Sequence, residues 1–484
     1  MDLREAAFSG EKPIDGKVHV KPVFVFLAHH NAAEGPCRTG TPEQLAPETE
    51  RRRAEQAYAG MTDLIKSQSP FSPFARVLDP VFIEHGDDWL VKAQEYAKLD
   101  ADADEVDLYL VTGHSLNQFF AVKLGERYRK PVAMVGGELD PALPMMVDAG
   151  SHLRAKGLEA YLSVGWDEFR ELLSLLYVRK AMQATRVLRV TQGQFDNVNG
   201  SFLDISHYQR HLGLESVDIP IKTFAAAWDR VRQDPKTWRI AQETAEALVE
   251  NAEASHIEMP YVAHDVAFYL AAKSLMETYG CNAFTIDCFE ICPDGRMAAE
   301  RKTVPCLTHV LFKDQGMPSS CEGDIGVLSA LMLVQCLAQR TAYMGNLFLV
   351  NREENLIKIL HDVPGLKLKG YDAPDVPYEL RNFALEGWGT TVRYDFCQDK
   401  GQPVTIARVS PGADKLMVTK GVIAGCGGFD TPGCSLEVVI QVEDAVAFFH
   451  KAVDVGNHSA MVYGDYSRQL SALGELMGLE VIEA

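Results

Sequence analysis

The sequence predicts an α/β protein with two doubly wound, Rossmann-like domains followed by a C-terminal β-rich domain. Its 484 residues exceed what one ordinary hydrophobic core serves. Short apolar runs alternate with helical stretches in its first part, as expected for strands buried on both faces of a parallel sheet. Beyond about residue 362, alternating polar and apolar residues are typical of half-buried antiparallel strands. We therefore place the domains at residues 1–180, 181–361 and 362–484.

The first domain is predicted from three apolar runs that are each followed within two residues by Gly or His, at residues 23–27, 108–111 and 132–135. Helices are predicted over residues 48–66 and 88–99. No GxGxxG motif follows a predicted strand, so a dinucleotide site is not expected.

Three polar side chains, His29, His30 and Arg38, follow the first predicted strand. Sites in open α/β sheets form beyond the carboxyl ends of strands, and these groups would suit a sugar hydroxyl or an anion. A solvated loop is the simpler account of them. We carry them forward as candidate substrate-binding residues.

The second domain is predicted to begin with a strand over residues 187–190. Further elements are predicted as a turn at 193–197, helices at 238–254 and 265–279, a strand at 283–286 and a buried helix at 325–338. Residues 358–362 have the pattern of a helix end, which Pro364 would terminate. The third domain is predicted from strands at 392–396, 404–409, 416–419 and 436–440 and helices at 444–453 and 467–477.

Composition excludes several classes of function. The formal net charge of −20, without a basic stripe, argues against nucleic-acid binding. The longest apolar run, residues 325–338, is too short to span a membrane, and residues 1–5 lack the apolar core of a secretory signal. The ten cysteines contain no CxxC pair, which favours reduced thiols in the cytoplasm.

The most informative stretch is Cys-Glu-Gly-Asp at residues 321–324, between a polar segment at 313–320 and the apolar run. Carboxylates at the start of a buried helix need hydrogen bonds, a cation or the helix N-terminus to offset their desolvation. A divalent metal would supply that offset, with Glu322, Asn346, His361 and His458 as candidate ligands. The alternative is a capping box, in which Glu322 or Asp324 only neutralises the helix N-terminus.

Each of the other candidates also has a purely structural explanation. His361 would interact favourably with the helix dipole at a helix C-terminus, and Asn346, taken alone, is a common turn residue. Asp287 and Glu290 lie at or beyond the carboxyl end of a predicted strand, where they would act as a second acid/base. Asp287 would equally well cap a turn.

Taken together, these segments resemble the L-fucose isomerase/L-arabinose isomerase family of metal-dependent aldose–ketose isomerases. The resemblance covers roughly residues 185–484, whereas the first domain matches only in its α/β character. The matching motifs are TIDCFE at 285–290, PSSCEGD at 318–324, YMGN at 343–346, LH at 360–361, GNH at 456–458 and YGD at 463–465.

The resemblance implies a three-domain subunit in a homo-oligomer, hexameric or trimer-based, in which a neighbour's first domain helps to close the pocket. It implies a divalent metal, Mn²⁺ first and Mg²⁺ or Co²⁺ as alternatives. Glu322 occupies the place of a carboxylate that is both ligand and acid/base, His458 that of the C-terminal ligand, and His361 that of the additional histidine of the arabinose isomerases. Where the family carries a second Asp or Glu, this chain has Asn346, which cannot shuttle a proton.

We therefore expect an isomerase that converts a free monosaccharide through a cis-enediol, with Glu322 as the base. A fucose- or arabinose-type sugar is the first expectation for the substrate. An anionic hexose such as sulfoquinovose is the alternative. A non-catalytic sugar-binding protein, or metal-dependent aldol cleavage or hydrolysis, would use a similar site.

Overall fold

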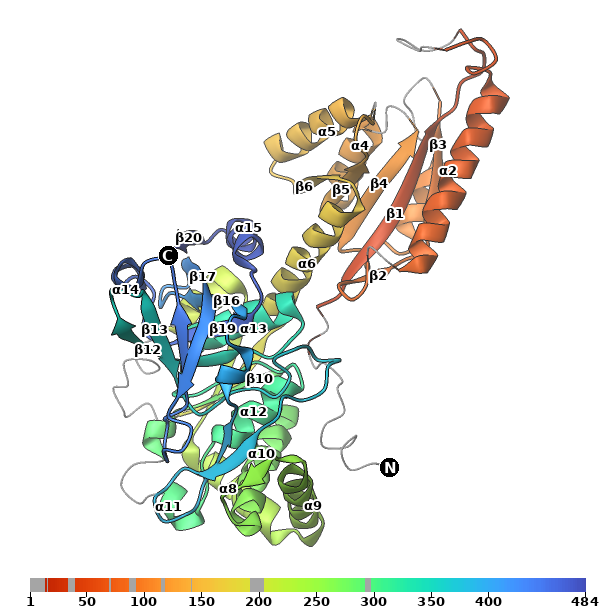
Figure 1. The fold of residues 1–484 in the computed structure, drawn as a ribbon. Helices are drawn as coiled ribbons and strands as arrows, with labels where there is room; N and C mark the ends of the chain where they lie inside the picture. The colour runs from red at the N-terminus through yellow and green to blue at the C-terminus, as the bar shows by residue number, and fades with distance from the viewer. Residues whose placement is uncertain are drawn as a thin grey trace. The chain divides into compact units, whose positions relative to one another are not determined.

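The computed structural model describes residues 14, 16–33, 40–68, 71–86, 93–114, 118–140, 142–191, 204–291 and 297–484. The chain contacts divide it into two compact units, one from Gly16 to Tyr177 and one that includes Val178 to Ala484. Parallel sheets covered by helices and a mainly antiparallel C-terminal sheet confirm the α/β class (Figure 1). The predicted turn at 193–197, and Arg38, lie outside the described residues.

The first unit contains a parallel sheet of six strands, in the order β2-β1-β4-β5-β6 with β3 also paired to β1. Its strands are β1 Val18–Leu27, β2 Ala75–Val77, β3 Val81–His85, β4 Leu108–His114, β5 Val132–Gly136 and β6 Ala160–Val164. Its helices are α2 Pro47–Ser67, α3 Ala93–Asp100, α4 Gln118–Tyr128, α5 Leu143–Ala155 and α6 Trp166–Gln183, which continues into the second unit.

The strand order reverses at β1, because the chain adds β2 and β3 on one side of it and β4, β5 and β6 on the other. Right-handed crossovers then place helices on both faces, and α2 and α5 lie on opposite sides of the sheet (Figure 1). His29 follows β1 directly, so it lies at the point where sites of such sheets form.

The second unit adds nine α-helices or helical turns with two short 3₁₀ segments among the described residues, and three sheets. Its helices after α6 are α7 Ile205–Leu212, α8 Ile221–Gln233, α9 Pro235–Asn251, α10 Met259–Tyr279, α11 Met297–Arg301, α12 Cys306–Asp314, α13 Ile325–Ala338, α14 Ala445–Ala452 and α15 Ser467–Met477, and the 3₁₀ segments are η1 Cys288–Glu290 and η3 Phe396–Asp399. A small sheet joins β9 Ala254–Ser255, β14 Glu379–Asn382 and β15 Thr390–Arg393.

A four-stranded parallel sheet carries the first part of the candidate site. Its strands, in the order β11-β10-β7-β8, are β7 Arg186–Val190, β8 Glu215–Ile219, β10 Ala283–Ile286 and β11 Ser319–Ser320. Thr285 pairs with Ser320, so the residues that follow these two neighbouring strands leave the same edge of the sheet. Asp287 and Glu322 therefore start from adjacent positions.

The C-terminal sheet closes on itself. Its order is β16-β19-β12-β13-β18-β17, and β16 also pairs with β17, which makes a six-stranded antiparallel barrel with β20 added in parallel to β17. The strands are β12 Tyr343–Asn351, β13 Leu356–Leu360, β16 Pro403–Val409, β17 Lys415–Gly427, β18 Glu437–Gln441, β19 Ser459–Tyr463 and β20 Glu480–Glu483. Strands β12 and β13 lie before the predicted domain boundary at 361, yet they belong to this barrel.

The register of β12 brings the two candidate histidines together. Asn346 pairs with Leu360 of β13, and Gly345 pairs with Ser459 of β19. His361 and His458 are the next residues along, so they flank one point of β12 from its two sides. A Cβ at Gly345 would lie 2.5 Å from the Leu360 carbonyl oxygen, so this close strand pairing requires glycine there.

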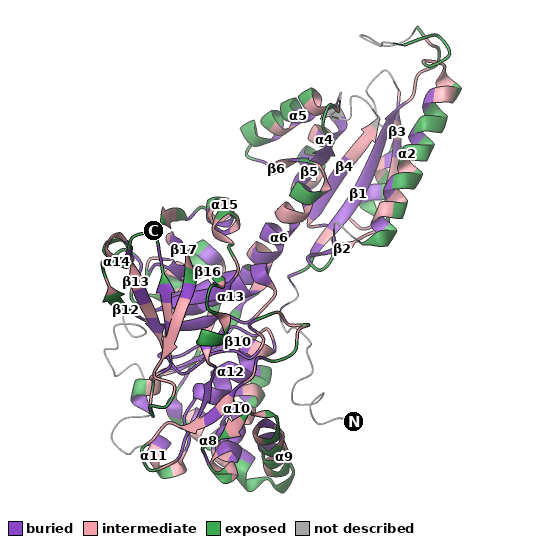
Figure 2. Cartoon of the chain, in the orientation of Figure 1, coloured by how far each residue is buried: buried purple, intermediate pink, exposed green. Residues whose placement is uncertain are grey.

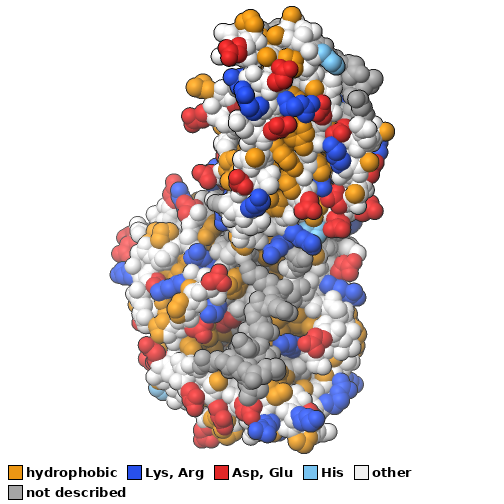
Figure 3. All heavy atoms as spheres, turned by 90° about the vertical axis from the view of Figure 1, so that its right-hand side faces the viewer, with side chains coloured by type: hydrophobic (Ala, Val, Ile, Leu, Met, Phe, Trp, Pro, Cys, Tyr) orange, Lys and Arg blue, Asp and Glu red, His pale blue; other side chains and the backbone are white. Residues whose placement is uncertain are grey.

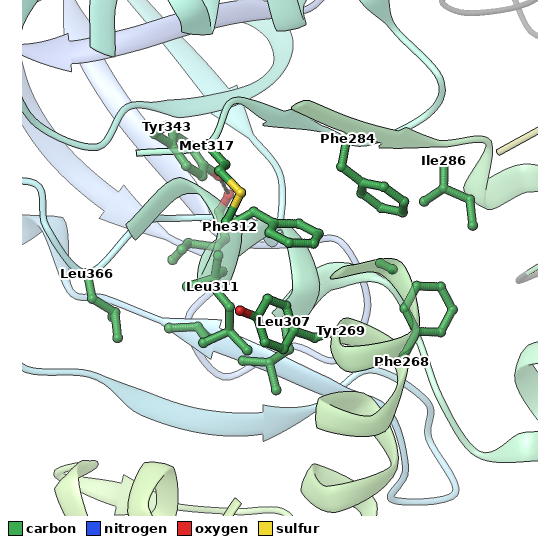
Figure 4. Close-up of a cluster of buried hydrophobic side chains, with 14 of the residues drawn as sticks. Phe268, Tyr269, Phe284, Ile286, Leu307, Leu311, Phe312, Met317, Tyr343 and Leu366 are labelled. Atoms are coloured by element: carbon green, nitrogen blue, oxygen red, sulfur yellow. Dashed lines mark hydrogen bonds between the residues drawn. The ribbon is translucent and has the colours of Figure 1, made fainter. Parts of the chain in front are cut away.

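Helix α13 links the parallel sheet to the barrel. Apart from Ser329 and Gln335 its residues are apolar, and all but Cys336 are buried, as expected for a helix surrounded by protein (Figure 2). It packs against β16 and β19 of the barrel. Beside it, side chains from α10, β10 and α12, including Phe268, Phe284 and Phe312, form the core beneath the parallel sheet (Figure 4).

Several sequence expectations are corrected by the structure. Residues 358–362 do not end a helix: Leu356–Leu360 form strand β13, with the alternating burial of a barrel strand. Asn346 lies within β12 rather than in a turn. The helix predicted over 238–254 ends at Asn251, because the chain then enters β9. The strand predicted over 392–396 ends at Arg393.

No helix among the described residues has the length and apolarity needed to cross a membrane. On the face drawn in Figure 3, Lys and Arg side chains are interspersed with Asp and Glu side chains. Where this face is described, basic side chains thus alternate with acidic ones and do not form a continuous basic surface.

Lys313, at the end of α12, should make the stability of the protein depend on pH. Its ammonium is fully buried and donates hydrogen bonds to the carbonyl oxygens of Ala342 and Val363. Burial lowers the pKa of Lys313 from 10.5 to about 7, although Asp314 opposes the shift. Between these two values the unfolded chain binds more protons than the folded one, so this lysine makes stability rise with pH.

Lys313→Met removes that dependence. We compare the free energy of unfolding of wild type and Lys313→Met, measured in urea. Between pH 7 and pH 9 the wild-type value should rise by up to about 1.4 kcal/mol per pH unit relative to that of the variant. Titrating groups that do not interact with Lys313 cancel in this difference, which therefore reports Lys313 together with its neighbours Asp314 and His309. Parallel stability curves for the two proteins would show that Lys313 is charged in the folded state.

Candidate metal centre

Glu322, His361 and His458 converge in the second unit. Each offers one ligand atom, these atoms lie within 4.8 Å of one another, and all three side chains are buried. His361 Nε2 lies 3.4 Å from Glu322 Oε1, and His458 Nε2 lies 3.5 Å from Glu322 Oε2. One carboxylate thus faces two imidazoles, one through each of its oxygens.

The backbone around Glu322 is held in an unusual conformation. Glu322 has φ 60° and Gly323 has φ 65°, so two consecutive residues occupy the left-handed region. The Gly323 N–H donates to the Ile286 carbonyl oxygen at 3.0 Å, which ties this turn to the end of β10. A residue other than glycine in this region costs about 1–2 kcal/mol, a kind of strain that clusters at functional sites.

Asp324, two residues later, caps α13. Its Oδ1 accepts a hydrogen bond from the Val327 N–H at 3.1 Å, so Asp324, and not Glu322, neutralises the helix N-terminus. Its Oδ2 accepts from Arg408 Nη1 at 2.8 Å and lies 3.0 Å from His458 Nδ1. Burial opposes the charged form, but Arg408 and His458 outweigh it and hold the pKa of Asp324 at about 2.

The His458 ring therefore has a defined orientation. An ionised carboxylate can only accept, so Nδ1 carries a proton and Nε2 is the ring atom turned toward Glu322. That Nε2 atom is buried without a hydrogen-bond partner and lies 3.5 Å from Glu322 Oε2. An imidazole nitrogen and a carboxylate directed at each other in a buried site are the donor set of a metal ion, so these residues fit one.

His361 is held differently. Tyr343 Oη accepts from the His361 N–H at 2.7 Å, and His361 Nδ1 accepts from the Asp362 N–H at 3.1 Å. Burial lowers the pKa of His361, but Cys434 and Glu322 outweigh burial and raise it to about 9. Both observations put a proton on Nε2, which a cation would have to displace.

The remaining predicted acid/base and ligand residues have other contacts. The Asn346 amide oxygen accepts from Asn457 Nδ2. Asp287 caps η1 by accepting from the Phe289 N–H at 3.2 Å, which is the turn-capping alternative. Glu290 is buried at the end of η1.

The predicted substrate-binding histidines lie in the first unit. His29 Nδ1 lies 2.8 Å from Glu50 Oε2, and both side chains are nearly buried, so His29 is not a solvated loop residue. His30 follows it and is exposed. The Glu50 contact was not predicted.

Sequence reasoning missed three residues around the ligand set. Arg408 was noted only as part of a strand, Tyr343 only as part of a motif, and Asp324 as a capping residue without its contact to His458. One sequence signal was available for Arg408: it lies in phase with Val404 and Ile406 of the predicted strand, so it would share their buried face, where a charge requires a partner. Which partner it finds depends on contacts between distant segments.

Comparison with known proteins gives partial matches. No model of a known protein family matches the chain. The chain is 31% identical over 187 residues to a sulfoquinovose isomerase of Priestia aryabhattai, and equally to one of Priestia megaterium, covering 36% of this chain and 39% of each relative. It is 26% identical over 268 residues to a sulfoquinovose isomerase of Alkalicoccus urumqiensis, covering 53% of this chain and 56% of that relative. The matches thus span between about two fifths and somewhat over half the length of these curated relatives.

The backbone at Glu322 yields a stability prediction. Glu322→Gly and Glu322→Ala both remove the carboxylate, so their difference isolates the left-handed backbone. We expect Glu322→Gly to be more stable than Glu322→Ala by about 1 kcal/mol in urea unfolding. The control is the exposed α9 residue Glu246, where the helix reverses the order and Ala should exceed Gly. Equal stability of the two Glu322 variants would show that the turn is not strained.

The two histidines should contribute unequally to metal binding. The His458 ring is bound at Nδ1 by Asp324, a contact that orients Nε2 and makes it a stronger ligand, whereas His361 must lose its Nε2 proton. In Mn²⁺ titrations followed by electron paramagnetic resonance, His458→Ala should lose about 10-fold or more in affinity beyond the loss in His361→Ala. His256→Ala, at a half-exposed histidine paired with Glu379, should bind like wild type. A larger loss in His361→Ala would reverse the assignment.

Proposed function

We propose that the chain is a metal-dependent aldose–ketose isomerase whose substrate is an anionic hexose of the sulfoquinovose kind. The observation that carries the proposal is the buried Glu322 carboxylate facing His361 and His458. The names of the three relatives support the isomerase activity, and they favour the anionic hexose over the fucose- or arabinose-type sugar.

Glu322, His458 and His361 would hold the ion. One carboxylate with two imidazoles suits Mn²⁺, with Mg²⁺ and Co²⁺ as alternatives, better than thiolate-seeking metals. A bound divalent ion would act as a Lewis acid that polarises the carbonyl of the open-chain sugar and acidifies the neighbouring C–H bond. Asn346 accepts a hydrogen bond from Asn457 through its amide oxygen, whose second lone pair keeps it a candidate for a further ligand.

Glu322 is the proposed base. One of its oxygens takes the proton from C2 of the open-chain aldose, the C–H electron pair forms a C1–C2 double bond, and the carbonyl electron pair moves to O1, which gains a proton to complete the cis-enediol. The same carboxyl group then returns its proton to C1, while O2 loses its proton and becomes the carbonyl oxygen of the ketose. The buried surroundings of Glu322, whose side chain is 8% exposed, limit exchange of that proton with water.

The proton on oxygen needs a second group. Asn346 cannot carry it, because an amide does not shuttle protons. Asp287 and Glu290 are the proposed candidates, since both are buried beside the edge of the sheet from which the Glu322 turn leaves. His29, His30 and Arg38 remain our proposal for the anionic end of the sugar, contributed within a homo-oligomer, hexameric or trimer-based, in the cytoplasm.

The test is a substrate panel. Purified protein with Mn²⁺ should convert sulfoquinovose to its ketose, at a higher kcat/KM than L-fucose or D-arabinose, as followed by nuclear magnetic resonance. Chelation should abolish turnover, and Glu322→Gln should lower kcat by about 100-fold or more, the size typical of removing an acid/base group. Glu95→Gln, at a buried carboxylate of the first unit, is the matched control and should retain activity.

Other outcomes would identify the rival functions. Sugar binding that survives chelation without any product would indicate a non-catalytic binding protein. Three-carbon products would indicate aldol cleavage. Conversion of L-fucose or D-arabinose in preference to sulfoquinovose would restore the first substrate expectation.

A further inference from the structure

We infer that Asp324 and Arg408 are positioning residues of this site, which together fix the His458 ring so that its Nε2 atom faces Glu322. The inference rests on the proposed function only in treating Nε2 as a ligand atom. The orientation of the ring is a property of the chain itself and is measurable without any ion.

The two carboxylate oxygens of Asp324 bind to different parts of the chain. Oδ1 accepts from the Val327 N–H and so fastens the carboxylate to the first turn of α13. Oδ2 is shared by Arg408 Nη1, from β16, and His458 Nδ1, just before β19. With no exposed surface, the carboxylate has its plane set by three partners from three separate segments. The ring that binds to Oδ2 inherits that orientation.

Arg408 holds the ring from a second direction. Its Nε donates to the Val455 carbonyl oxygen at 3.0 Å, while Nη1 donates to Asp324. Val455 begins the segment that leads to His458. The planar guanidinium thus donates hydrogen bonds both to the carboxylate and to the backbone that precedes the histidine. A lysine could not make both bonds with the same fixed geometry.

The chain leaves room for this guanidinium with two glycines. A Cβ at Gly326 would lie 2.8 Å from Arg408 Nη2, and a Cβ at Gly456 would lie 3.2 Å from it. Gly456 also has φ 109°, a conformation that favours glycine. The two glycines lie on either side of the contact, one in α13 and one in the turn before His458.

A second buried pair shows what a purely structural role looks like. Arg393 donates to Asp362 and to the carbonyl oxygens of Thr431 and Gly433, with neither charged side chain exposed. Asp362 accepts from the N–H groups of Ser435 and Leu436. The Asp362 side chain and Arg393 fasten a loop, and the contact of Asp362 with an imidazole is made by its backbone N–H to His361 Nδ1, not by its carboxylate. Among the described residues neither side chain of this pair bonds to His458, so Arg393→Met is a control of equal burial for the His458 ring.

The experiment follows the His458 ring in metal-free protein by ¹⁵N spectroscopy of labelled histidine, with the signal assigned by its loss in His458→Ala. Wild type should show the form protonated at Nδ1. Arg408→Met and Asp324→Asn should show a mixture that includes the form protonated at Nε2. Arg393→Met should lose comparable stability in urea yet leave the His458 signal unchanged.

Metal affinity gives the second readout. Calorimetric titration with Mn²⁺ should weaken by about 10- to 100-fold in Arg408→Met and Asp324→Asn, as expected when a partner that orients a ligand is removed. Arg408→Lys should recover part of that loss by restoring the charge. If Arg408→Met does not fold, Arg408→Lys and Asp324→Asn carry the same comparison.

The outcomes separate the inference from the proposed function. If the variants are destabilised like Arg393→Met but keep wild-type His458 signals and Mn²⁺ affinity, the pair is structural only and the inference is wrong. If wild type binds no Mn²⁺, the proposed function fails, while the ¹⁵N spectra still decide whether Asp324 and Arg408 orient the ring.

Discussion

The Asp324 carboxylate joins the three parts of the second unit on which the candidate site depends. It caps α13, pairs with Arg408 on β16 and receives the ring of His458 before β19. Burying an aspartate and an arginine is costly, and the cost is offset only when every polar atom finds a partner with good geometry. Removing Asp324 would leave the buried Arg408 without its carboxylate, and removing Arg408 would leave Asp324 with His458 and the Val327 N–H alone. The direction of the histidine is therefore set by this contact, which also adds to the packing of α13 against the barrel.

Around that contact, two sheets of different kinds bring their functional residues to one place. The parallel sheet delivers Glu322 from the edge where β10 and β11 end, in a turn with two left-handed residues. The barrel delivers His361 and His458 from opposite sides of β12, where Gly345 permits close strand pairing. Neither sheet alone carries both a carboxylate and an imidazole of the group. The site is thus a product of their packing through α13.

The two imidazoles are prepared for different roles. Asp324 binds the Nδ1 proton of His458 and so turns Nε2 toward Glu322, whereas His361 shares a proton with Glu322 in the ion-free chain. Such an arrangement keeps the buried carboxylate compensated before an ion binds and directs both imidazoles at the place where the ion would displace a proton. Strain at Glu322 fits the same picture, because the carboxylate side chain is retained at a position where glycine would be easier.

Local sequence patterns determined much of the fold. The apolar run at 325–338 predicted α13 with its observed bounds, and the run at 283–286 predicted β10, because burial on all sides leaves a continuous apolar signal. The Cys-Glu-Gly-Asp motif, together with family resemblance, pointed to Glu322, His361 and His458. The pattern near His361 was misread as a helix end, since a five-residue strand offers too few periods to separate the two structures.

Only the tertiary structure decided what these residues contact. Asp324 meets Arg408 across 84 residues of sequence and His458 across 134, and no local period encodes such a pairing. Closure of the barrel, the register at Gly345 and the orientation of the His458 ring likewise depend on which segments pack together. Short-range patterns indicate whether a side chain will be buried. Which group it then contacts depends on the whole fold, through the desolvation cost, the charge interactions and the packing of distant segments.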